Sequence, residues 1–404
     1  MATRPATEGT ITVPAFPEGR AEKRAALMQA VEQVRDVVME RADEAEELGT
    51  LPLPTVEALE AAGLFRLKLP RELGGAEADP VTHLEVVEAV SYIDPSAGWT
   101  TMIGSTSIGL LGAYLPDEAI AQIFPGGKIP RAAAVTIPAG KAAPVDGGYN
   151  VSGRWPFASG SRHAHWLAGG GRVPSDGDAP PVYRMFAFPA EAAELQDNWH
   201  VSGLQGTGSC DFVLPERFIP EAFAWDFLAG PPHRGGPLYH IRAPGSMANE
   251  HAGFALGVAR RALDTVVEIG ATKRRGYAMK RSSLADRGVF QRMVGENDLR
   301  LRAARQLTID AYERAFETVS AGEKVPPKLQ AEMRAVCAFA TAVAADVTTD
   351  AFRYAGASAL YKTSLLQRHL RDINAASQHV TVSDIAYENH GKFILDLPDA
   401  DPRG

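Results

Sequence analysis

The sequence predicts an α+β protein that is mostly helical, with a β domain between two helical parts. Three observations lead to this prediction. Apolar residues recur at helical spacing in the first third of the chain. Between residues 129 and 232 the chain becomes rich in glycine and proline and contains short alternating runs. From about residue 246 the helical spacing returns and holds almost to the end.

The length of 404 residues favours two or three subdomains rather than a single core. We expect a flexible tail over residues 1–20, an N-terminal helical domain over 21–128, a central β domain over 129–232 and a C-terminal four-helix bundle over 233–404. The tail is rich in Thr, Pro and Gly and lacks the apolar segment of a signal peptide.

The N-terminal domain begins with an amphipathic pattern over residues 21–47, where apolar side chains are three or four positions apart. Pro54 suits the first turn of a second helix, because its missing N–H would be unpaired there anyway. Gly63 suits the cap that ends this helix. Further helical patterns cover residues 79–93 and 98–115.

The middle segment has short runs typical of strands, at residues 132–135, 149–152, 165–168, 183–188 and 211–214. Asp146-Gly147-Gly148 lies between the first two runs and indicates a hairpin. We therefore expect a small β-sandwich or barrel.

The C-terminal part predicts four long helices, at about residues 246–270, 289–319, 326–354 and 364–395. Gly253 and Gly257 in the first helix, and many alanines in the third, allow neighbouring helices to approach closely. Long helices with short connections form a bundle.

Composition excludes several classes of protein. Apolar residues make up 45% and charged residues 22%, as in ordinary soluble proteins. The net charge is −8 without a long basic run, which argues against nucleic acid as a partner. Cys210 and Cys337 lie far apart, which argues against a disulfide framework or zinc site and favours the cytoplasm. The longest uncharged run, residues 335–345, is shorter than the roughly 20 residues that cross a bilayer.

Common catalytic motifs are absent from the sequence: it has no P-loop, Rossmann glycine motif, H-E-x-x-H or G-x-S-x-G. Gly206-Thr207-Gly208 is interpreted as a turn rather than a phosphate loop, because a strand and not a helix follows it. His163 and His165 have no third ligand nearby, so we assign them structural roles and no metal.

Residues 153–166 are the most informative stretch. In a strand, Trp155, Phe157 and Ser159 would share one face. Such a face can stack a flat heteroaromatic ring and offer a hydroxyl to its edge. An aromatic core of the β domain is the alternative interpretation.

The last predicted helix carries many polar groups on a segment that must face a bundle. Arg368 and Asp372 are four residues apart and can pair, and Asp372 and His379 are seven apart, on one face of a helix. Buried polar groups need partners from the protein or from a ligand. A lone histidine here can also be an ordinary core or surface residue.

Together these segments resemble the acyl-CoA dehydrogenase superfamily, and more closely its two-component flavin-dependent monooxygenase branch with a type 2 C-terminal domain. The resemblance spans about residues 21–395 and implies the acyl-CoA dehydrogenase fold. Its motifs are Ala61-Ala62-Gly63-Leu64, Leu69-Pro70-Arg71-Glu72-Leu73-Gly74-Gly75, Ala97-Gly98-Trp99, Thr136-Ile137-Pro138, residues 147–166 and residues 366–379.

The resemblance also implies a flavin site. Phe157-Ala158-Ser159 matches the Trp-Ile-Thr strand of the dehydrogenases, which implies that Ser159 meets flavin N5 and that Phe157 and Trp155 flank the ring. Thr136 matches the threonine at the pyrimidine edge. Arg275 is the nearest match to the flavin-phosphate arginine, and Arg368 is counted with the cofactor contacts. The implied cofactor is reduced FMN or FAD, with FMN slightly preferred, and O2 is the co-substrate.

The catalytic base separates the branches of this superfamily. Dehydrogenases need a carboxylate about eight residues after an Arg-Asp pair. Here that distance from Arg371-Asp372 leads to His379, the pattern of the monooxygenase branch. Glu388 lies about two helical turns too late. Where many monooxygenases of this branch place a histidine after Gly-Trp, this chain has Ser105, Thr106 and Ser107.

The resulting hypothesis is a monooxygenase in which His379 and Ser159 are catalytic. Reduced flavin would come from a separate NAD(P)H:flavin reductase, and a small organic substrate would be oxygenated through a C4a-hydroperoxyflavin, with the flavin supplying the chemistry. The resemblance implies a cytoplasmic homotetramer. Two alternatives stay open: an acyl-CoA dehydrogenase-type desaturase, and a flavin-less homologue that serves as a binding subunit. The sequence does not identify the substrate or the oxidised atom.

Overall fold

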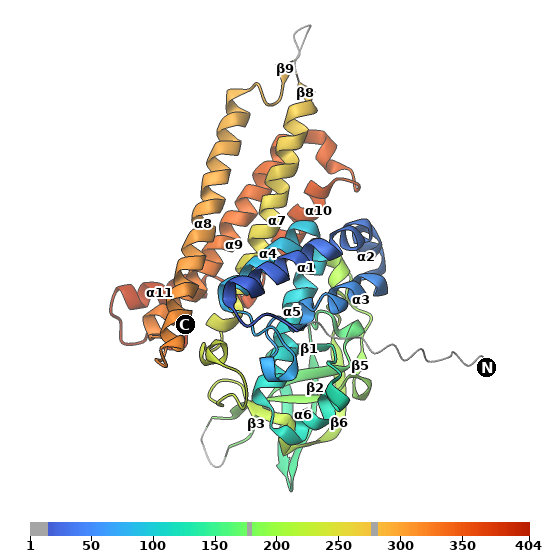
Figure 1. Ribbon diagram of the computed structural model, residues 1–404, viewed down its shortest axis with the longest axis vertical. Helices are drawn as coiled ribbons and strands as arrows, with labels where there is room; N and C mark the ends of the chain where they lie inside the picture. The colour runs from blue at the N-terminus through green and yellow to red at the C-terminus, as the bar shows by residue number, and fades with distance from the viewer. Residues whose placement is uncertain (1–14, 176–179, 276–281) are drawn as a thin grey trace, which may run out of the picture.

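The computed structural model describes residues 15–175, 180–275 and 282–404, with Arg275 and Ser282 described by their backbone alone. A helical bundle, a group of shorter helices and a β-sheet follow one another along the long axis (Figure 1). The predicted order of helices, strands and helices is confirmed, and so is the α+β, mostly helical class.

The N-terminal part consists of α1 (Arg20–Glu40), α2 (Ala42–Leu48), α3 (Leu53–Ala61), α4 (Pro80–Ile93), α5 (Pro95–Tyr114) and α6 (Asp117–Ile123). The predicted apolar face of α1 is buried. The Asp79 side chain accepts from two backbone N–H groups at the start of α4, and Asp94 accepts from Ala97 N at the start of α5. These caps satisfy donors that a helix start leaves unpaired.

The described part of the central domain contains a seven-stranded sheet in the order β5-β6-β2-β1-β3-β4-β7. The strands are β1 (Ala132–Val145), β2 (Gly148–Trp155), β3 (Trp166–Val173), β4 (Val182–Pro189), β5 (Glu194–Leu195), β6 (Phe212–Pro220) and β7 (Ala224–Asp226). β1 and β2 pair antiparallel, with Val145 opposite Gly148, which confirms the predicted hairpin.

Trp155, at the end of β2, fills the interior of this domain. It is fully buried, and its indole stacks on Phe212 with 5.1 Å between ring centroids. A Cβ atom on Gly140 or Gly169 would come within 2.5 or 2.4 Å of this indole, so glycine at both positions makes room for the ring. The aromatic-core alternative for Trp155 is therefore the correct one.

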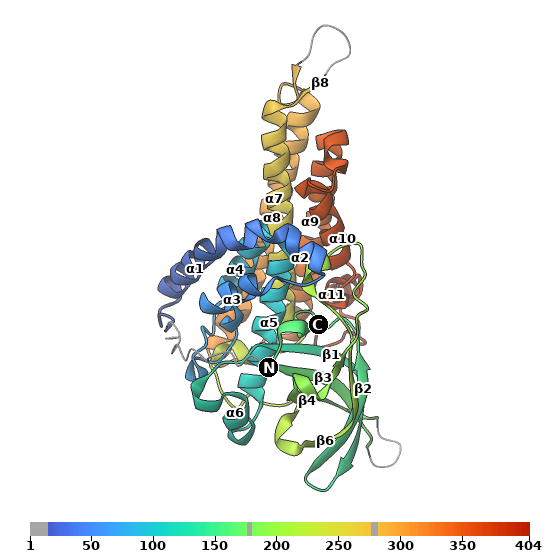
Figure 2. The ribbon, with the colours of Figure 1, turned by 90° about the vertical axis from the view of Figure 1, so that its right-hand side faces the viewer.

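The C-terminal part contains α7 (Gly245–Thr272), α8 (Gly288–Ser320), α9 (Pro327–Ala355), α10 (Leu365–Ala376) and α11 (Ile385–Ile394), with the short strands β8 (Arg274–Arg275) and β9 (Ser282–Ser283) between α7 and α8. In both views α7, α8 and α9 stand beside one another (Figures 1 and 2). The predicted close approach of helices is confirmed. A Cβ atom added to Gly253 would lie 2.5 Å from a backbone oxygen of α4, and one added to Gly257 would lie 2.2 Å from another, so only glycine allows this packing.

The fourth predicted helix is wrong as a single element, since the chain leaves the helix after α10 and starts α11 at Ile385. His379 lies in the break. Its Nδ1 accepts a hydrogen bond from Thr381 N (3.3 Å), and Ser383 Oγ donates to Val380 O. Such local bonds between side chains and backbone compete with helical hydrogen bonding.

The segment of α9 and the turn after it, Pro327–Leu360, is long and apolar enough to cross a membrane, with a mean hydropathy of 1.3 in its most apolar window. However, 61% of that window is buried inside the protein, where α9 packs between the other bundle helices. α9 is a core helix of a soluble bundle.

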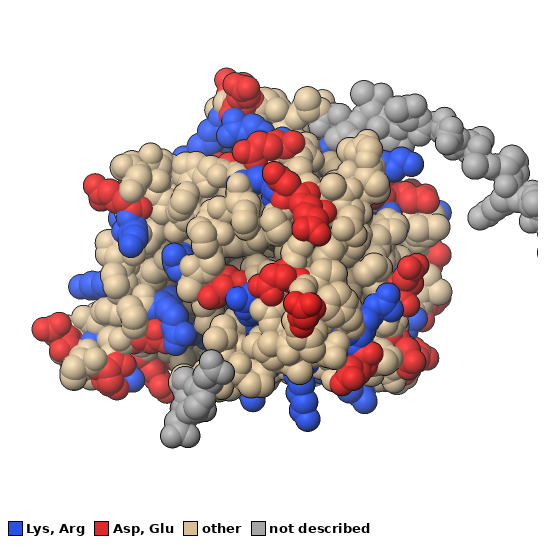
Figure 3. All heavy atoms as spheres, turned by 90° about the horizontal axis from the view of Figure 1, so that it is seen from below, with Lys and Arg blue, Asp and Glu red and all other residues tan. Residues whose placement is uncertain are grey.

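Positive and negative side chains are interspersed on the face seen in Figure 3.

Candidate active site

Ser159 lies at the interface between the β domain and the helices, just after β2 ends. Its Oγ accepts a hydrogen bond from Trp99 Nε1 on α5 (2.9 Å) and shares another with Ser209 Oγ (2.7 Å). The side chain is 6% exposed. The hydroxyl is therefore held in one orientation by groups from two other segments.

A tight turn supplies the second of these segments. Leu204 and Gly208 adopt left-handed backbone conformations (φ 54° and 57°) on either side of a 3₁₀ turn. Thr207 Oγ1 contacts Ser209 Oγ at 2.6 Å, and Gly160 N donates to Thr207 O. The predicted turn at residues 206–208 is confirmed, and it lines the site with two hydroxyls that sequence patterns did not single out.

His379 reaches the same region from the break after α10. Its ring lies 5.9 Å from the Trp99 ring, edge to face, and 4.2 Å from the His251 ring, nearly parallel (30°). Trp99 also meets His251 edge on, at 5.3 Å. Ser159 and His379 thus both contact the indole of Trp99.

Both imidazoles are neutral near pH 7. Burial lowers the pKa of His379 to about 4, and the nearby charge of Arg334 acts in the same direction. Burial and the neighbouring His379 and Lys68 hold the pKa of His251 well below its usual value. A neutral imidazole can accept a proton from a substrate hydroxyl or amine.

His251 was not predicted. It is a single histidine on a long helix, and helical spacing alone does not distinguish it from an ordinary core residue. Only the three-dimensional contact with His379 identifies it, because the two residues lie on different elements.

A buried polar cluster lies on the other side of α7. Glu250 is fully buried, and its Oε2 accepts hydrogen bonds from Lys68 Nζ (3.0 Å) and Thr106 Oγ1 (2.6 Å). Nearby, His83 Nε2 and Ser105 Oγ lie 3.2 Å apart. Many monooxygenases of the branch that this chain resembles have a histidine in the sequence near position 105. Here that position is a serine, and a histidine from another helix, His83, contacts it.

The predicted aromatic face of Trp155, Phe157 and Ser159 is wrong. The strand ends at Trp155, and Phe157 has a positive φ of 63°. Side chains after Trp155 therefore no longer alternate between the two faces of a strand. Trp155 donates its Nε1–H to Gly170 O (2.7 Å) inside the β domain, so it has no surface to offer a flavin. Phe157 is 65% exposed and meets Trp199 edge on at 6.3 Å.

The predicted pair of Arg368 and Asp372 is also wrong. Arg368 forms ion pairs with Asp43 and Glu46 of α2 instead. Asp372 accepts a hydrogen bond from Leu204 N (2.6 Å), and burial raises its pKa to about 7. These contacts join α10 to α2 and to the turn beside Ser159.

The other predicted residues lie as follows. Thr136 is half-buried on β1, and its carbonyl accepts a hydrogen bond from the Tyr183 hydroxyl. The side chain of Arg275 lies outside the described residues. His163 Nε2 contacts Leu51 O (2.9 Å), a structural role. Glu388, the dehydrogenase alternative, is exposed on α11.

These residues fit a flavin. Phe157 presents an exposed aromatic ring beside Trp199, which suits a flat heteroaromatic partner. Ser161, four residues after Phe157, has a buried hydroxyl with no partner among the described residues. Ser159 adds an oriented hydroxyl, the kind of group that meets the edge of such a ring.

Comparison with known proteins agrees with this geometry. Residues 20–125 match the acyl-CoA dehydrogenase N-terminal domain, and residues 250–384 match an acyl-CoA dehydrogenase C-terminal domain of type 2. An indole-3-acetate monooxygenase from Pseudomonas putida is 32% identical over 84% of this chain and 86% of its own. The chain belongs to the acyl-CoA dehydrogenase superfamily, in its branch of flavin-dependent monooxygenases.

Other members of this branch cover nearly the whole chain. A pigment production hydroxylase from a Rhodococcus species is 30% identical over 94% of this chain and 98% of its own. The 3-HSA hydroxylase from Rhodococcus sp. RHA1 superposes with a TM-score of 0.86 at 29% identity, covering 94% of this chain and 99% of its own. XiaF from Streptomyces, crystallised with FADH2 and glycerol, also gives 0.86, at 27% identity and over 95% and 97% of the two chains.

Proposed function

We propose that this chain is the oxygenase component of a two-component system that hydroxylates a small aromatic substrate. A separate NAD(P)H:flavin reductase delivers reduced flavin. One atom of O2 enters the substrate and the other leaves as water, with reduced flavin as the electron donor. The convergence of Ser159 and His379 on Trp99 is the observation that supports this proposal best. Relatives named for indole-3-acetate and resorcinol support an aromatic substrate.

Bound reduced flavin supplies the activation of oxygen, and the protein keeps water away and orients the reactants. Ser159 would hold the N5 edge of the ring, with its Oγ fixed by Trp99 and Ser209. Phe157 and Trp199 would cover part of the ring. Thr136 and Arg368 stay as predicted cofactor residues, although the Arg368 guanidinium is paired with Asp43 and Glu46 of α2.

His379 would hydrogen-bond the substrate hydroxyl or amine through Nε2, or take its proton at Nδ1 once the long bond from Thr381 N (3.3 Å) is given up. A pKa of about 4 keeps the ring neutral at pH 7, so one ring nitrogen carries a hydrogen and the other a lone pair. A second imidazole, that of His251, stacks against it and is also neutral. General base action of this kind contributes about 10²–10⁴-fold to a rate.

The first test mixes the reduced-flavin complex rapidly with oxygenated buffer and follows the return of the oxidised flavin spectrum. We expect slow return with the wild type, and faster return with more H2O2 for Ser159→Ala, because the N5 edge loses its partner. His379→Gln should keep the slow return but lose at least about 100-fold in product formation.

The control is His233→Gln, which removes an exposed imidazole from the loop before α7 and should change neither rate. Bleaching of the oxidised flavin by acyl-CoA would contradict the proposal and support a desaturase. Failure to bind either FMN or FAD would support a flavin-less homologue. Titration with each flavin also decides which of the two is preferred.

We also propose a homotetramer in the cytoplasm. Large apolar side chains are exposed along α8 and α9, among them Val289, Leu299 and Leu307, and further copies of the chain would cover them. Cys210 and Cys337 are buried free thiols, which fits a reducing compartment. Sedimentation analysis tests the oligomeric state.

A further inference from the structure

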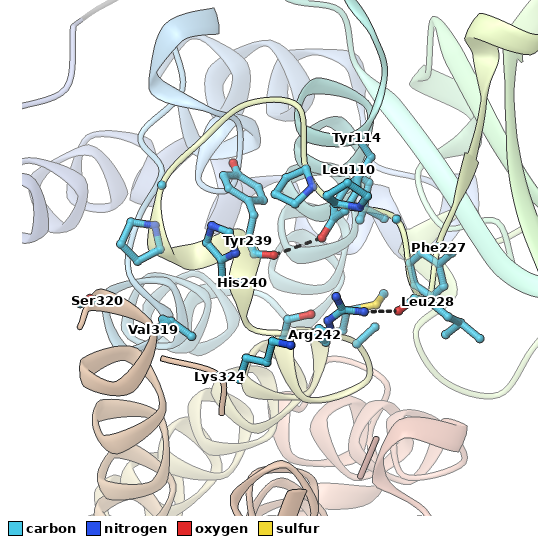
Figure 4. A pocket seen from close by; sticks show the side chains of 18 of the residues that line it. Leu110, Tyr114, Phe227, Leu228, Tyr239, His240, Arg242, Val319, Ser320 and Lys324 are labelled. Carbon is cyan, nitrogen blue, oxygen red and sulfur yellow. Dashed lines mark hydrogen bonds between the residues drawn. The ribbon is translucent and has the colours of Figure 1, made fainter. Parts of the chain in front are cut away.

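A cavity of about 430 Å³ opens where the end of α5, the loop before α7 and the turn between α8 and α9 meet (Figure 4). Its size lies within the range of about 300–1,000 Å³ that small-molecule sites occupy. Its walls are largely apolar and aromatic and include Leu110, Tyr114, Phe227 and Tyr239. Tyr114 donates a hydrogen bond to Tyr239 O, which ties two of the walls together.

A second, smaller chamber adjoins this cavity at the start of α7. It shares five of the cavity's lining residues, namely Leu110, Tyr114, Tyr239, Ser246 and Met247. The smaller chamber is also lined by Lys68 and Thr106, the two side chains that bind the buried carboxylate of Glu250. The cavity therefore adjoins a chamber of about 40 Å³ that borders the buried polar cluster.

The smaller chamber lies close to the candidate active site. Glu250 directly precedes His251 on α7, and the charge of Lys68 is near enough to lower the pKa of His251. On α5, Thr106 lies two helical turns from Trp99, or about 10 Å along the axis at 1.5 Å per residue.

The outer end of the cavity is polar and carries more positive than negative charge. Arg242 and Lys324 line it, against the single carboxylate of Glu323 among the described lining residues. Figure 4 shows Arg242, His240 and Lys324 around the opening. The Arg242 guanidinium donates to Leu228 O, which holds it at the cavity wall.

We propose that this cavity is a binding site for a flat apolar molecule that carries a carboxylate, with the ring against the apolar walls and the carboxylate near Arg242 and Lys324. Apolar walls favour the ring, and a guanidinium and an ammonium group favour the anion. Calling this molecule the substrate rests on the proposed function. The binding of such a molecule in the cavity does not rest on the proposed function.

The test compares carboxylates with their neutral amides. Phenylacetate, 3-phenylpropanoate and indole-3-acetate, and the amide of each, are titrated into the flavin-loaded protein by calorimetry. We expect at least one acid to bind at least about fivefold more tightly than its amide, a preference of the size that exposed charge pairs give. The preference should shrink as salt rises.

The double variant Arg242→Gln/Lys324→Gln should lose this preference while the amide binds as before. Arg292→Gln/Lys362→Gln removes two exposed cations from other places and should retain it. Equal binding of acid and amide, no binding of any acid, or an unchanged preference in the double variant would each overturn the proposal.

The same proteins separate this inference from the proposed function. Rapid mixing of reduced flavin with oxygen, without any aromatic acid, reports on Ser159 and the flavin alone. If the acid preference is found but the flavin reoxidises at once, the binding site stands and the monooxygenase mechanism fails. If reoxidation is slow but the preference is absent, the reverse holds.

Discussion

At the scale of single residues, Trp99 connects the site. A buried indole N–H needs an acceptor, and Ser159 Oγ provides it. The same ring touches both imidazoles edge on, so it also fixes their spacing. One side chain therefore positions both groups to which we assign catalytic roles.

Trp99→Phe should loosen this arrangement while keeping an aromatic ring. A lost hydrogen bond of this kind is worth about 0.5–1.5 kcal/mol, so we expect the share of reduced flavin that ends as H2O2 to rise by roughly threefold or more. The measurement is the ratio of H2O2 to flavin oxidised during turnover.

Trp225→Phe is the matched control, because the Trp225 indole is also buried but its Nε1–H has no acceptor among the described residues. It should leave the ratio unchanged. Equal H2O2 yields from Trp99→Phe and the wild type would show that the Trp99–Ser159 bond does not orient the hydroxyl during turnover.

At the scale of elements, α7 is the central support. It packs closely on α4 because Gly253 presents no side chain to the backbone of that helix. Gly253→Ala would place Cβ 2.5 Å from Leu84 O, and overpacking of a core costs about 1–3 kcal/mol. We expect a lower midpoint of urea unfolding with an unchanged slope.

Gly295→Ala on α8 makes the contrasting variant. Nothing lies within 4 Å of its new Cβ, so the helix should gain about 0.5–1 kcal/mol through reduced freedom of the unfolded chain. If both variants shift the midpoint in the same direction, close contact between α4 and α7 is not what Gly253 provides.

Sequence patterns predicted the long elements well and the irregular ones poorly. Long apolar periodicity placed α7, α8 and α9 correctly, because many residues contribute to each pattern. The same reasoning carried a helix through His379 and a strand through Phe157. At these two places the backbone conformation is set by a few local hydrogen bonds and by one positive φ angle. The spacing of apolar residues contains no information about either.

At the scale of the whole molecule, the site is assembled from segments far apart in sequence. Trp99 comes from α5, Ser159 from the end of β2, His251 from α7 and His379 from the break after α10. The resemblance to a family indicated Ser159 and His379 through their motifs. The contact between His251 and His379 depends on how α7 meets the break, which is set by packing and not by any local pattern.

Buried imidazoles also make the stability of the molecule depend on pH. Burial, with the nearby charge of Arg368, lowers the pKa of His369 from 6.5 to about 3. Between these values the unfolded chain binds a proton that the folded chain does not. The stability that comes from keeping His369 neutral is therefore complete above pH 6.5 and decreases as the pH falls towards 3.

Buried carboxyl groups act in the opposite direction. The pKa of Asp372 is raised to about 7 and that of Asp94 to about 6, in both cases by burial. Each keeps its proton in the folded state at a pH where the unfolded chain has lost it. Their contribution to stability is thus greatest at low pH and is lost as the pH rises, so total stability alone does not reveal the effect of His369.

The variant His369→Leu isolates the contribution of His369 to the pH dependence of stability. The free energy of unfolding of the wild type should fall between pH 6.5 and pH 5 by about 1.6 kcal/mol more than that of the variant, since the unfolded imidazole binds half a proton at pH 6.5 and nearly a whole one at pH 5. Urea unfolding at both pH values gives the difference, in which the carboxyl groups cancel. The exposed His200, changed to Gln, should show no such difference. Parallel pH dependence of His369→Leu and the wild type would mean that His369 is solvated when the protein is folded.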